Sequence, residues 1–305
     1  MIIYIGAMQI PSYPEFSPIK LEMRDELHPQ LSHLKFGISE FTFANLFLFR
    51  KTYDYRLSRL NDGGIVISGR KEGEDFAMLP FGLPDDETLI SLFSDHLYIK
   101  NLAEPYAAAG QIDLERKGFC VIEDRDNFDY LYLTKDLAHL PGKKYHKKRN
   151  LVKQFINNYE YSEVKIDADN IKDAFSVARQ WADDRDDPGD TAAAVEALEL
   201  KDILDLCGYL YYADGVPAAY VLGEPIARGK GFVVHFEKAV GSYKGIYQFI
   251  NKAFASILPH NISFINREQD LGDQGLRQAK MTYRPTGFVK KYRVYIDPTC
   301  PCPQE

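Results

Sequence analysis

The sequence predicts an α/β protein of two consecutive domains, each built around a mixed β-sheet. The chain has 305 residues, which is about twice the length of an ordinary domain. Two hairpin patterns, with turns at Asp62 and Asp214, lie 152 residues apart, and a similar order of strands and helices follows each turn. This repetition indicates two copies of one domain. We expect an N-terminal domain at residues 1–140 and a C-terminal domain at residues 141–305.

The first half shows its hairpin most clearly. Polar and apolar residues alternate from Tyr53 to Leu60, and the chain turns at Asn61-Asp62-Gly63-Gly64 before an apolar return strand. Asp-Gly readily adopts the positive φ angles of a tight turn, so the pattern predicts a hairpin. The elements expected to follow are a strand at 76–81, a helix at 87–93, a strand at 97–102 and a helix at 105–111.

The second half repeats this order around the turn at Asp214-Gly215. Its hairpin is preceded by expected helices at 171–181 and 191–206. The elements expected after it are a strand at 231–240, a helix at 246–258, a strand at 262–265, a helix at 272–282 and a final strand at 289–296 that closes the second half.

Composition excludes several classes of protein. Hydrophobic residues make up 45% of the chain, which is enough for packed cores. No apolar run approaches the roughly 18 to 20 residues that span a bilayer, and the opening residues lack a basic leader, so we expect a cytoplasmic protein. The histidines show no metal-binding spacing, and we expect no metal. The Cys300-Pro-Cys302 tail is either a redox or metal handle or an ordinary tail.

Basic residues are concentrated in two islands although the net charge is −7. Residues 135–153 contain seven Lys or Arg and one acid, and residues 274–296 contain six and no acid. Such islands favour phosphate-bearing ligands such as tRNA or lipid headgroups, and the alternative is an ordinary solvated surface. The candidate phosphate or nucleic-acid contacts are Lys143, Lys144, Lys147, Lys148, Arg149, Arg277, Lys280 and Lys291.

The element order of each half resembles the GNAT-type N-acyltransferase fold. In that fold the donor's phosphates lie at the start of the helix after the fourth strand, where backbone N–H groups and the helix dipole favour anions. The corresponding helix of the first half opens with three carboxylates, Asp85, Asp86 and Glu87, which makes it a poor phosphate site. The second opens without an acid. The candidate donor-binding residues are Gly241, Ser242, Tyr243, Lys244 and Gly245.

This loop departs from the phosphate loop of that fold, which runs Gln/Arg-x-x-Gly-x-Gly/Ala. With the first glycine aligned on Gly245, Ser242 and Tyr247 occupy the flanking positions. The alternative is that the glycines only shape the turn between a strand and a helix.

Two further segments carry a closer resemblance. They are Lys143-Lys-Tyr-His-Lys-Lys-Arg-Asn150 and the long segment from Asn266-Arg-Glu-Gln-Asp270 to Tyr283-Arg-Pro285, with a final Lys291-Tyr292. Both are similar to signatures of the phosphatidylglycerol lysyltransferase C-terminal-domain family. The resemblance implies tandem GNAT-like domains and kinship with Fem-type enzymes, which move an aminoacyl group from tRNA to an amine or hydroxyl of a lipid or peptide.

The candidate catalytic residues lie on or just after the strands of the second half. His235 and Glu237 are expected to share one strand face, opposite Phe232, Val234 and Phe236, and either could take a proton from an acceptor. Glu268, close to Asp270, lies just beyond the strand at 262–265. Tyr283 occupies a position where GNAT enzymes often keep a phenol as general acid. The alternatives are satisfied core residues and, for Asp270, a helix cap.

Two functions therefore stay open. The first is a transferase that uses aminoacyl-tRNA or acyl-coenzyme A as donor, with a phospholipid or amine as acceptor and no tightly bound cofactor. The second is a non-catalytic binding module for a nucleotide, a phospholipid headgroup or RNA.

Overall fold

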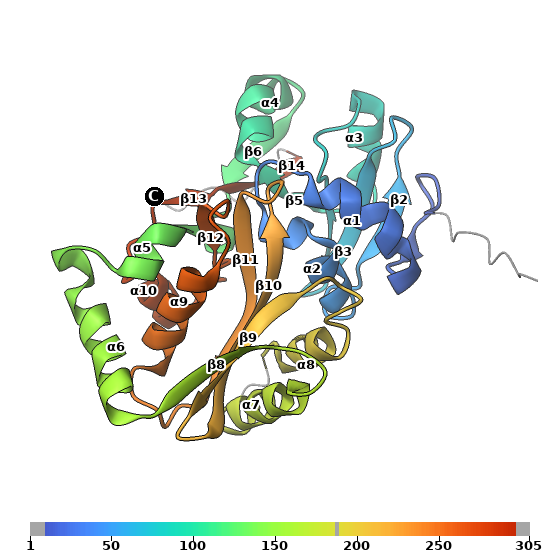
Figure 1. Ribbon diagram of the computed structural model, residues 1–305. Helices are drawn as coiled ribbons and strands as arrows, with labels where there is room; N and C mark the ends of the chain where they lie inside the picture. Colours follow the sequence, from blue (N-terminus) through green and yellow to red (C-terminus); the bar gives the residue numbers. More distant parts are fainter. Residues whose placement is uncertain (1–9, 187–188, 297–305) are drawn as a thin grey trace, which may run out of the picture. The chain divides into compact units, whose positions relative to one another are not determined.

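The computed structural model describes residues 10–186 and 189–296, and Cys300 and Cys302 lie outside this range. The chain divides into two compact units. Unit 1 contains the chain up to Phe128 together with the segment from Val289 onward, and unit 2 contains Asp129–Phe288. Each unit is an α/β structure around one seven-stranded mixed sheet (Figure 1). The predicted fold class is confirmed.

Unit 1 contains the first predicted hairpin, with its turn at Asp62. Its strands lie in the order β1 (Ser17–Pro18), β2 (Arg56–Arg59), β3 (Ile65–Lys71), β4 (Glu74–Met78), β5 (Tyr98–Ala103), β14 (Lys291–Ile296) and β6 (Phe119–Glu123). The pair β4 and β5 is parallel. The helices are α1 (Arg24–Ser32), α2 (Phe43–Leu48), α3 (Asp86–Leu92) and α4 (Glu104–Arg116).

Unit 2 repeats this topology. Its sheet has the order β8 (Tyr161–Lys165), β9 (Cys207–Ala213), β10 (Val216–Ile226), β11 (Gly231–Ala239), β12 (Phe264–Asn266), β7 (Asp129–Leu133) and β13 (Gly287–Val289). Here β11 and β12 are the parallel pair. The helices are α5 (Thr134–His139), α6 (His146–Asn158), α7 (Ile171–Asp183), α8 (Thr191–Glu199), α9 (Ile246–Ile257) and α10 (Gln274–Met281).

Each sheet contains an inner strand that is distant in sequence from a strand beside it. In unit 1, β14 comes from the C-terminal segment and lies between β5 and β6, antiparallel to both. In unit 2, β7 precedes the rest of the unit in sequence and lies antiparallel to β12. The expectation that the final strand at 289–296 closes the second half is therefore wrong. Unit 2 also begins at Asp129, before the boundary expected at 140/141.

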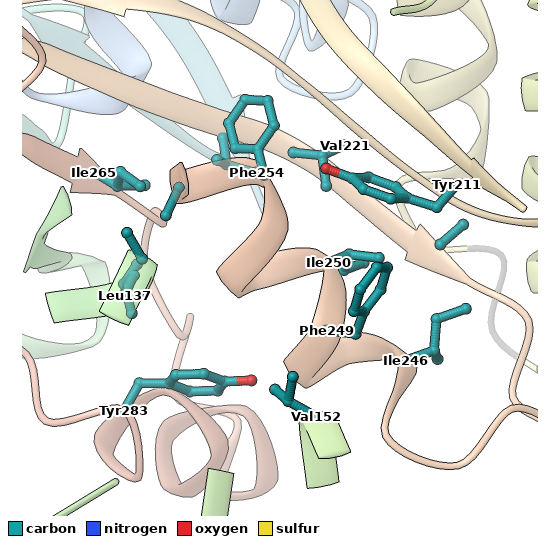
Figure 2. Close-up of a cluster of buried hydrophobic side chains, with 14 of the residues drawn as sticks. Leu137, Val152, Tyr211, Val221, Ile246, Phe249, Ile250, Phe254, Ile265 and Tyr283 are labelled. Carbon is teal, nitrogen blue, oxygen red and sulfur yellow. The ribbon is translucent and has the colours of Figure 1, made fainter. Parts of the chain in front are cut away.

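The core of unit 2 lies between the sheet and helices α5, α6 and α9 (Figure 2). Phe155 of α6 stacks on Phe249 of α9 with ring centroids 4.5 Å apart. The turn before α9 must also approach α6 closely. Gly245 is the N-cap of α9 with φ of 90°, and a Cβ at this position would lie 2.2 Å from the Leu151 carbonyl oxygen. Only glycine satisfies both conditions.

Gly245→Ala should lower the free energy of unfolding by about 3 kcal/mol, from the cost of positive φ and of overpacking against α6. The matched control is Gly215→Ala in the same unit, where φ is 77° and a Cβ would meet nothing within 4 Å. The control should lose only about 1 kcal/mol. Urea denaturation of both variants measures the difference, and equal losses would contradict the close approach of Gly245 to α6.

Candidate active site

The polar groups of unit 2 gather where β11 and β12 stop pairing. The parallel ladder joins Gly231 to Phe264, Phe232 to Ile265 and Val233 to Asn266, and it ends there. β11 continues to Ala239, whereas the chain after β12 turns away into residues 267–270. We call this region the fork and define it by residues 234–239 and 267–270. Four of the candidate residues lie in it: His235, Glu237, Glu268 and Asp270.

A β-bulge at His235 determines which side chains share a face. Gly223 of β10 pairs with Val234, and Leu222 pairs with Phe236, so His235 is an extra residue in β11. A bulge reverses the alternation of side chains beyond it. Phe232, Val234 and Ala239 belong to the core cluster that includes α9, and Glu237 accepts a hydrogen bond from Asn251 of that helix. The prediction that His235 and Glu237 share a face opposite Phe232, Val234 and Phe236 is therefore wrong.

His235 lies between two carboxylates on its face of the fork. Its Nδ1 is 2.8 Å from Glu268 Oε1, and its Nε2 is 3.0 Å from Glu224 Oε1. Burial by itself lowers the pKa of the imidazole, but the hydrogen bonds to Glu224 and Glu268 outweigh it and raise the pKa to about 9. His235 is therefore protonated at neutral pH and engaged at both ring nitrogens. A general-base role for it at this pH is disfavoured.

Glu237, Arg267 and Tyr283 meet on the α9 side of the fork. Arg267 Nη2 donates to Glu237 Oε1 at 3.0 Å, and Asn251 Nδ2 donates to the same oxygen at 2.8 Å. The Arg267 guanidinium carbon lies 5.1 Å from the centroid of the Tyr283 ring. Lys148 of α6 lies on the same ring, with its Nζ 3.8 Å from the centroid. An acid, a phenol and two cations are thus brought together from four segments of the chain.

Tyr283 is buried, with 5% of its surface exposed, beside Leu137 and Val152 (Figure 2). Its hydroxyl has no hydrogen-bond partner. Burial raises the pKa of the phenol to about 12 although Arg267 lowers it. Tyr283 is therefore a neutral hydrogen-bond donor at physiological pH.

Lys280 and Asp270 stabilise the loop after β12, although the sequence suggested Lys280 as a phosphate contact and Asp270 as a catalytic residue or helix cap. The Lys280 ammonium donates to the backbone carbonyls of Arg267, Glu268 and Gln269, and the side chain is buried. Asp270 accepts hydrogen bonds from Tyr130 at 2.6 Å and from Arg277 at 2.8 and 3.0 Å. These bonds stabilise the loop that carries Arg267 and Glu268.

Asp270 does not cap the following helix, because Asp273 accepts from the Leu276 N–H as the N-cap of α10. Burial raises the pKa of the Asp270 carboxyl, but hydrogen bonds from Arg277 and Tyr130 lower it well below its usual range. A role in proton transfer is therefore disfavoured for Asp270.

The glycine loop before α9 is largely accessible. Gly241, Ser242 and Lys244 are exposed, whereas Tyr243 is half-buried and packs edge-on against Tyr159. Gly245 has no side chain with which to cap the helix. One carboxylate is close, because a Cβ at Gly241 would lie 4.0 Å from Asp184 Oδ2. In unit 1 the equivalent helix start is capped by its own Asp85, which accepts from the Thr88 N–H.

The basic islands do not form one continuous patch. Lys143 and Lys147 are exposed. Lys144 pairs with Asp136 at 3.1 Å, and Arg149 donates to the carbonyls of Leu140 and Gly142.

The second island is divided between the units. Arg277 and Lys280 hold the loop of unit 2, whereas Lys291 is fully buried in unit 1 and pairs with Glu40. Its neighbours Lys290 and Arg293 pair with Glu123 and Asp124. Lys280 and Lys291 are thus committed to protein partners.

Sequence reasoning missed Arg267 of the fork and two residues that bond to the fork from outside it, Glu224 and Asn251. Glu224 carries a usable signal, since it is an acid within the apolar strand β10 and is buried. Arg267 lies inside the segment that carried the family resemblance, but its contact with Glu237 depends on the fork geometry.

Within residues 10–186 and 189–296, no helix is long and apolar enough to cross a membrane. In the same ranges, no three His, Cys, Asp or Glu side chains are grouped to hold a metal ion.

The His235 site predicts a pH-dependent stability. Because the folded pKa of about 9 exceeds the ordinary value of 6.5, protonation stabilises the fold fully below pH 6.5, and this contribution is lost as pH rises through 9. Relative to His235→Gln, the wild type should lose up to about 3 kcal/mol of unfolding free energy over that range. Denaturation at a series of pH values measures it. The control His260→Gln, at an exposed position, should follow the wild type. Parallel curves for wild type and His235→Gln would contradict the assignment.

The unpaired hydroxyl of Tyr283 predicts an unusual response to its removal. Tyr283→Phe should leave the free energy of unfolding unchanged or raise it, because a buried unsatisfied group is removed. Tyr132→Phe is the comparison, since the Tyr132 hydroxyl donates to the Lys280 carbonyl at 2.8 Å. It should lower the free energy by about 1 kcal/mol. Urea denaturation distinguishes them, and an equal loss in both would show that the Tyr283 hydroxyl is paired.

Several proteins resemble this chain in structure. A conserved protein of unknown function from Bacteroides thetaiotaomicron is 31% identical, with a TM-score of 0.82 over 92% of this chain and 99% of that one. L-PGS from Bacillus licheniformis is 13% identical, with a TM-score of 0.57 over 95% and 94% of the two chains. FemX is 10% identical, with a TM-score of 0.53 over 93% and 98%. The last two likenesses establish the tandem GNAT-like fold only.

In sequence, an uncharacterised protein of Mycoplasmoides gallisepticum is 27% identical over 176 residues. The match covers 55% of this chain and 56% of that protein. A second match in sequence, to a protein family, extends over both units. Because residues 32–295 match the family described as phosphatidylglycerol lysyltransferase, C-terminal, the chain belongs to that family.

Proposed function

We propose that the chain is a transferase that moves an aminoacyl or acyl group to an amine or hydroxyl acceptor at the fork of unit 2. The observation that carries this proposal is the convergence of Glu237, Arg267 and Tyr283 on one face of the fork. Membership in the phosphatidylglycerol lysyltransferase family supports the same class of reaction. The corresponding helix start of unit 1 is occupied by its own carboxylate, which favours unit 2 as the site.

The residues suggest a division of roles. The acceptor nitrogen or oxygen attacks the acyl carbon, and its proton passes to Glu237, one of whose oxygens is held by Arg267 and Asn251. The bond from the acyl carbon to the leaving oxygen or sulfur then breaks. Tyr283 donates its proton to that atom, Glu237 then releases the acceptor's proton to solvent, and the phenol regains a proton from solvent. A phenol with a pKa of about 12 stays protonated at neutral pH and can still donate to a departing alkoxide.

An aminoacyl-tRNA donor is favoured over acyl-coenzyme A. The phosphate loop of GNAT enzymes has a small residue where this chain has Tyr247, whose hydroxyl accepts from Trp181 at 3.2 Å. The Asp184 carboxylate near Gly241 is also unfavourable to a pyrophosphate. Lys143, Lys147 and Lys244 are exposed cations that suit an RNA backbone. A phospholipid headgroup or an amine is the proposed acceptor, and a cytoplasmic location would give access to charged tRNA.

The test is a transfer assay with the full chain, using a panel of labelled aminoacyl-tRNAs and acyl-coenzyme A thioesters with lipid and peptide acceptors. We expect Glu237→Gln and Tyr283→Phe each to lower kcat/KM by about 100-fold or more. Tyr220→Phe is the matched control for Tyr283→Phe. It also removes a buried, unpaired tyrosine hydroxyl in unit 2, and it should retain full activity.

Salt separates the two donors in the same assay. Binding of aminoacyl-tRNA should weaken steeply as salt rises, because many phosphate contacts release counterions, whereas acyl-coenzyme A should show a gentler slope. Lys147→Glu should weaken tRNA binding further. Loss of activity in Tyr220→Phe equal to that in Tyr283→Phe would contradict the role of Tyr283.

A second candidate function rests on the burial of Tyr283. A phenol that is 5% exposed and packed among Leu137 and Val152 is also consistent with a non-catalytic module that binds a nucleotide, a phospholipid headgroup or RNA. This candidate predicts ligand binding without transfer for every donor in the panel.

A further inference from the structure

We propose that Lys148, Arg267 and Tyr283 form a binding site for one singly charged oxyanion, a phosphodiester or a carboxylate. The three side chains come from α6, from the loop after β12 and from the segment after α10. This inference deepens the proposed function and rests on it only for the identity of the ligand as a substrate group. The site itself is argued from the groups that meet there.

The first step is that two hydrogen-bond donors in this cluster have no partner. Arg267 Nη1 and Tyr283 Oη are both buried and both lack a hydrogen bond. Gln248 and Arg267 both interact with the phenol and lower its pKa, but neither makes a hydrogen bond of ordinary geometry to it. A buried donor left without an acceptor destabilises the fold. Two of them beside one another indicate a site built for an acceptor supplied from outside.

The second step is that Lys148 completes the cluster. It lies one helical turn before Val152, which packs in the core beside Tyr283 (Figure 2). Residues one turn apart lie on the same side of a helix, so α6 directs Lys148 toward the same ring. Its ammonium lies over the Tyr283 ring at 3.8 Å. Burial and the neighbouring Arg267 lower the pKa of Lys148 to about 8. Two cations therefore repel each other across a partly buried space.

The third step is the charge balance. Glu237 is the carboxylate at this cluster, and its Oε1 accepts from Arg267 Nη2 and from Asn251. Lys148, Arg267 and Glu237 together carry one net positive charge. A singly charged oxyanion neutralises this charge and offers acceptors to all three donors. A neutral ligand would leave the two cations in repulsion, and a cationic ligand would add to it.

The experiment follows the lysine ammonium by NMR in the intact chain with selectively labelled lysine. The signal of Lys148 is assigned by its disappearance in Lys148→Met. Dimethyl phosphate and acetate are titrated separately, each against sodium chloride at equal ionic strength. We expect at least one of the two anions to raise the pKa of Lys148 by about one unit or more at saturation, because a bound anion favours the charged form. Dimethyl phosphate represents a phosphodiester and acetate a carboxylate, so the responding anion identifies the ligand chemistry.

The controls use neighbouring positions. The signal of Lys147, which is exposed and adjacent in sequence, should not respond beyond the effect of sodium chloride. Tyr283→Phe should weaken binding of the responding anion by about tenfold, since one hydrogen bond to a charged group is lost. Tyr220→Phe should not. No response of Lys148 to either anion, or a response equal to that with sodium chloride, would overturn the proposal and indicate that water satisfies the donors.

The readout is independent of catalysis. A chain that binds the anion but transfers nothing would contradict the proposed transferase and leave the site standing. A chain that transfers aminoacyl groups with Lys148→Met as active as wild type, and shows no anion response, would contradict only the site.

Discussion

The parallel ladder between β11 and β12 covers three residue pairs, and this short pairing determines where polar groups lie in unit 2. Beyond it, the two strands are linked by side chains instead of by backbone. Glu237 and Arg267 join them on the side of α9, and His235 and Glu268 join them on the opposite face. A buried ion pair adds little net stability, but loss of one partner leaves an uncompensated charge. Removal of either partner of an ion pair in the fork would therefore leave the other charge uncompensated.

Much of the fold could be predicted from local patterns. The hairpin turns at Asp62 and Asp214 were predicted correctly because Asp-Gly turns are specified by a few adjacent residues. The helix starting at Ile246 was also predicted, since its apolar periodicity is strong. The place of the final strand was not predicted. Residues 291–296 alternate like any edge or inner strand, and their partners β5 and β6 lie far away in sequence. No local pattern encodes that pairing.

The site was predicted in part. Glu237, Glu268 and Tyr283 do lie at or near the fork, because chain order places strand ends and the residues after them at one edge of a parallel pair. His235 and Glu237 lie on opposite faces of the sheet because β11 contains a single inserted residue. The sequence Val233-Val-His-Phe-Glu237 gives no sign of this bulge, since it has the pattern of an unbroken strand. The prediction that Lys280 and Lys291 contact phosphates missed their burial for a different reason. Lys280 and Lys291 look like surface residues by composition, but each is buried against oxygen atoms that only the tertiary structure supplies.

The place of β14 makes unit 1 discontinuous in the chain, whereas unit 2 is one continuous segment. A fragment ending at residue 140 would carry β7 without the sheet that receives it, and would leave the space between β5 and β6 empty. The complementary fragment would carry β14 and lack the inner strand beside β12. A cut at residue 140 therefore leaves both sheets incomplete. During synthesis, the sheet of unit 1 can be completed only after the whole of unit 2 and then β14 have been made.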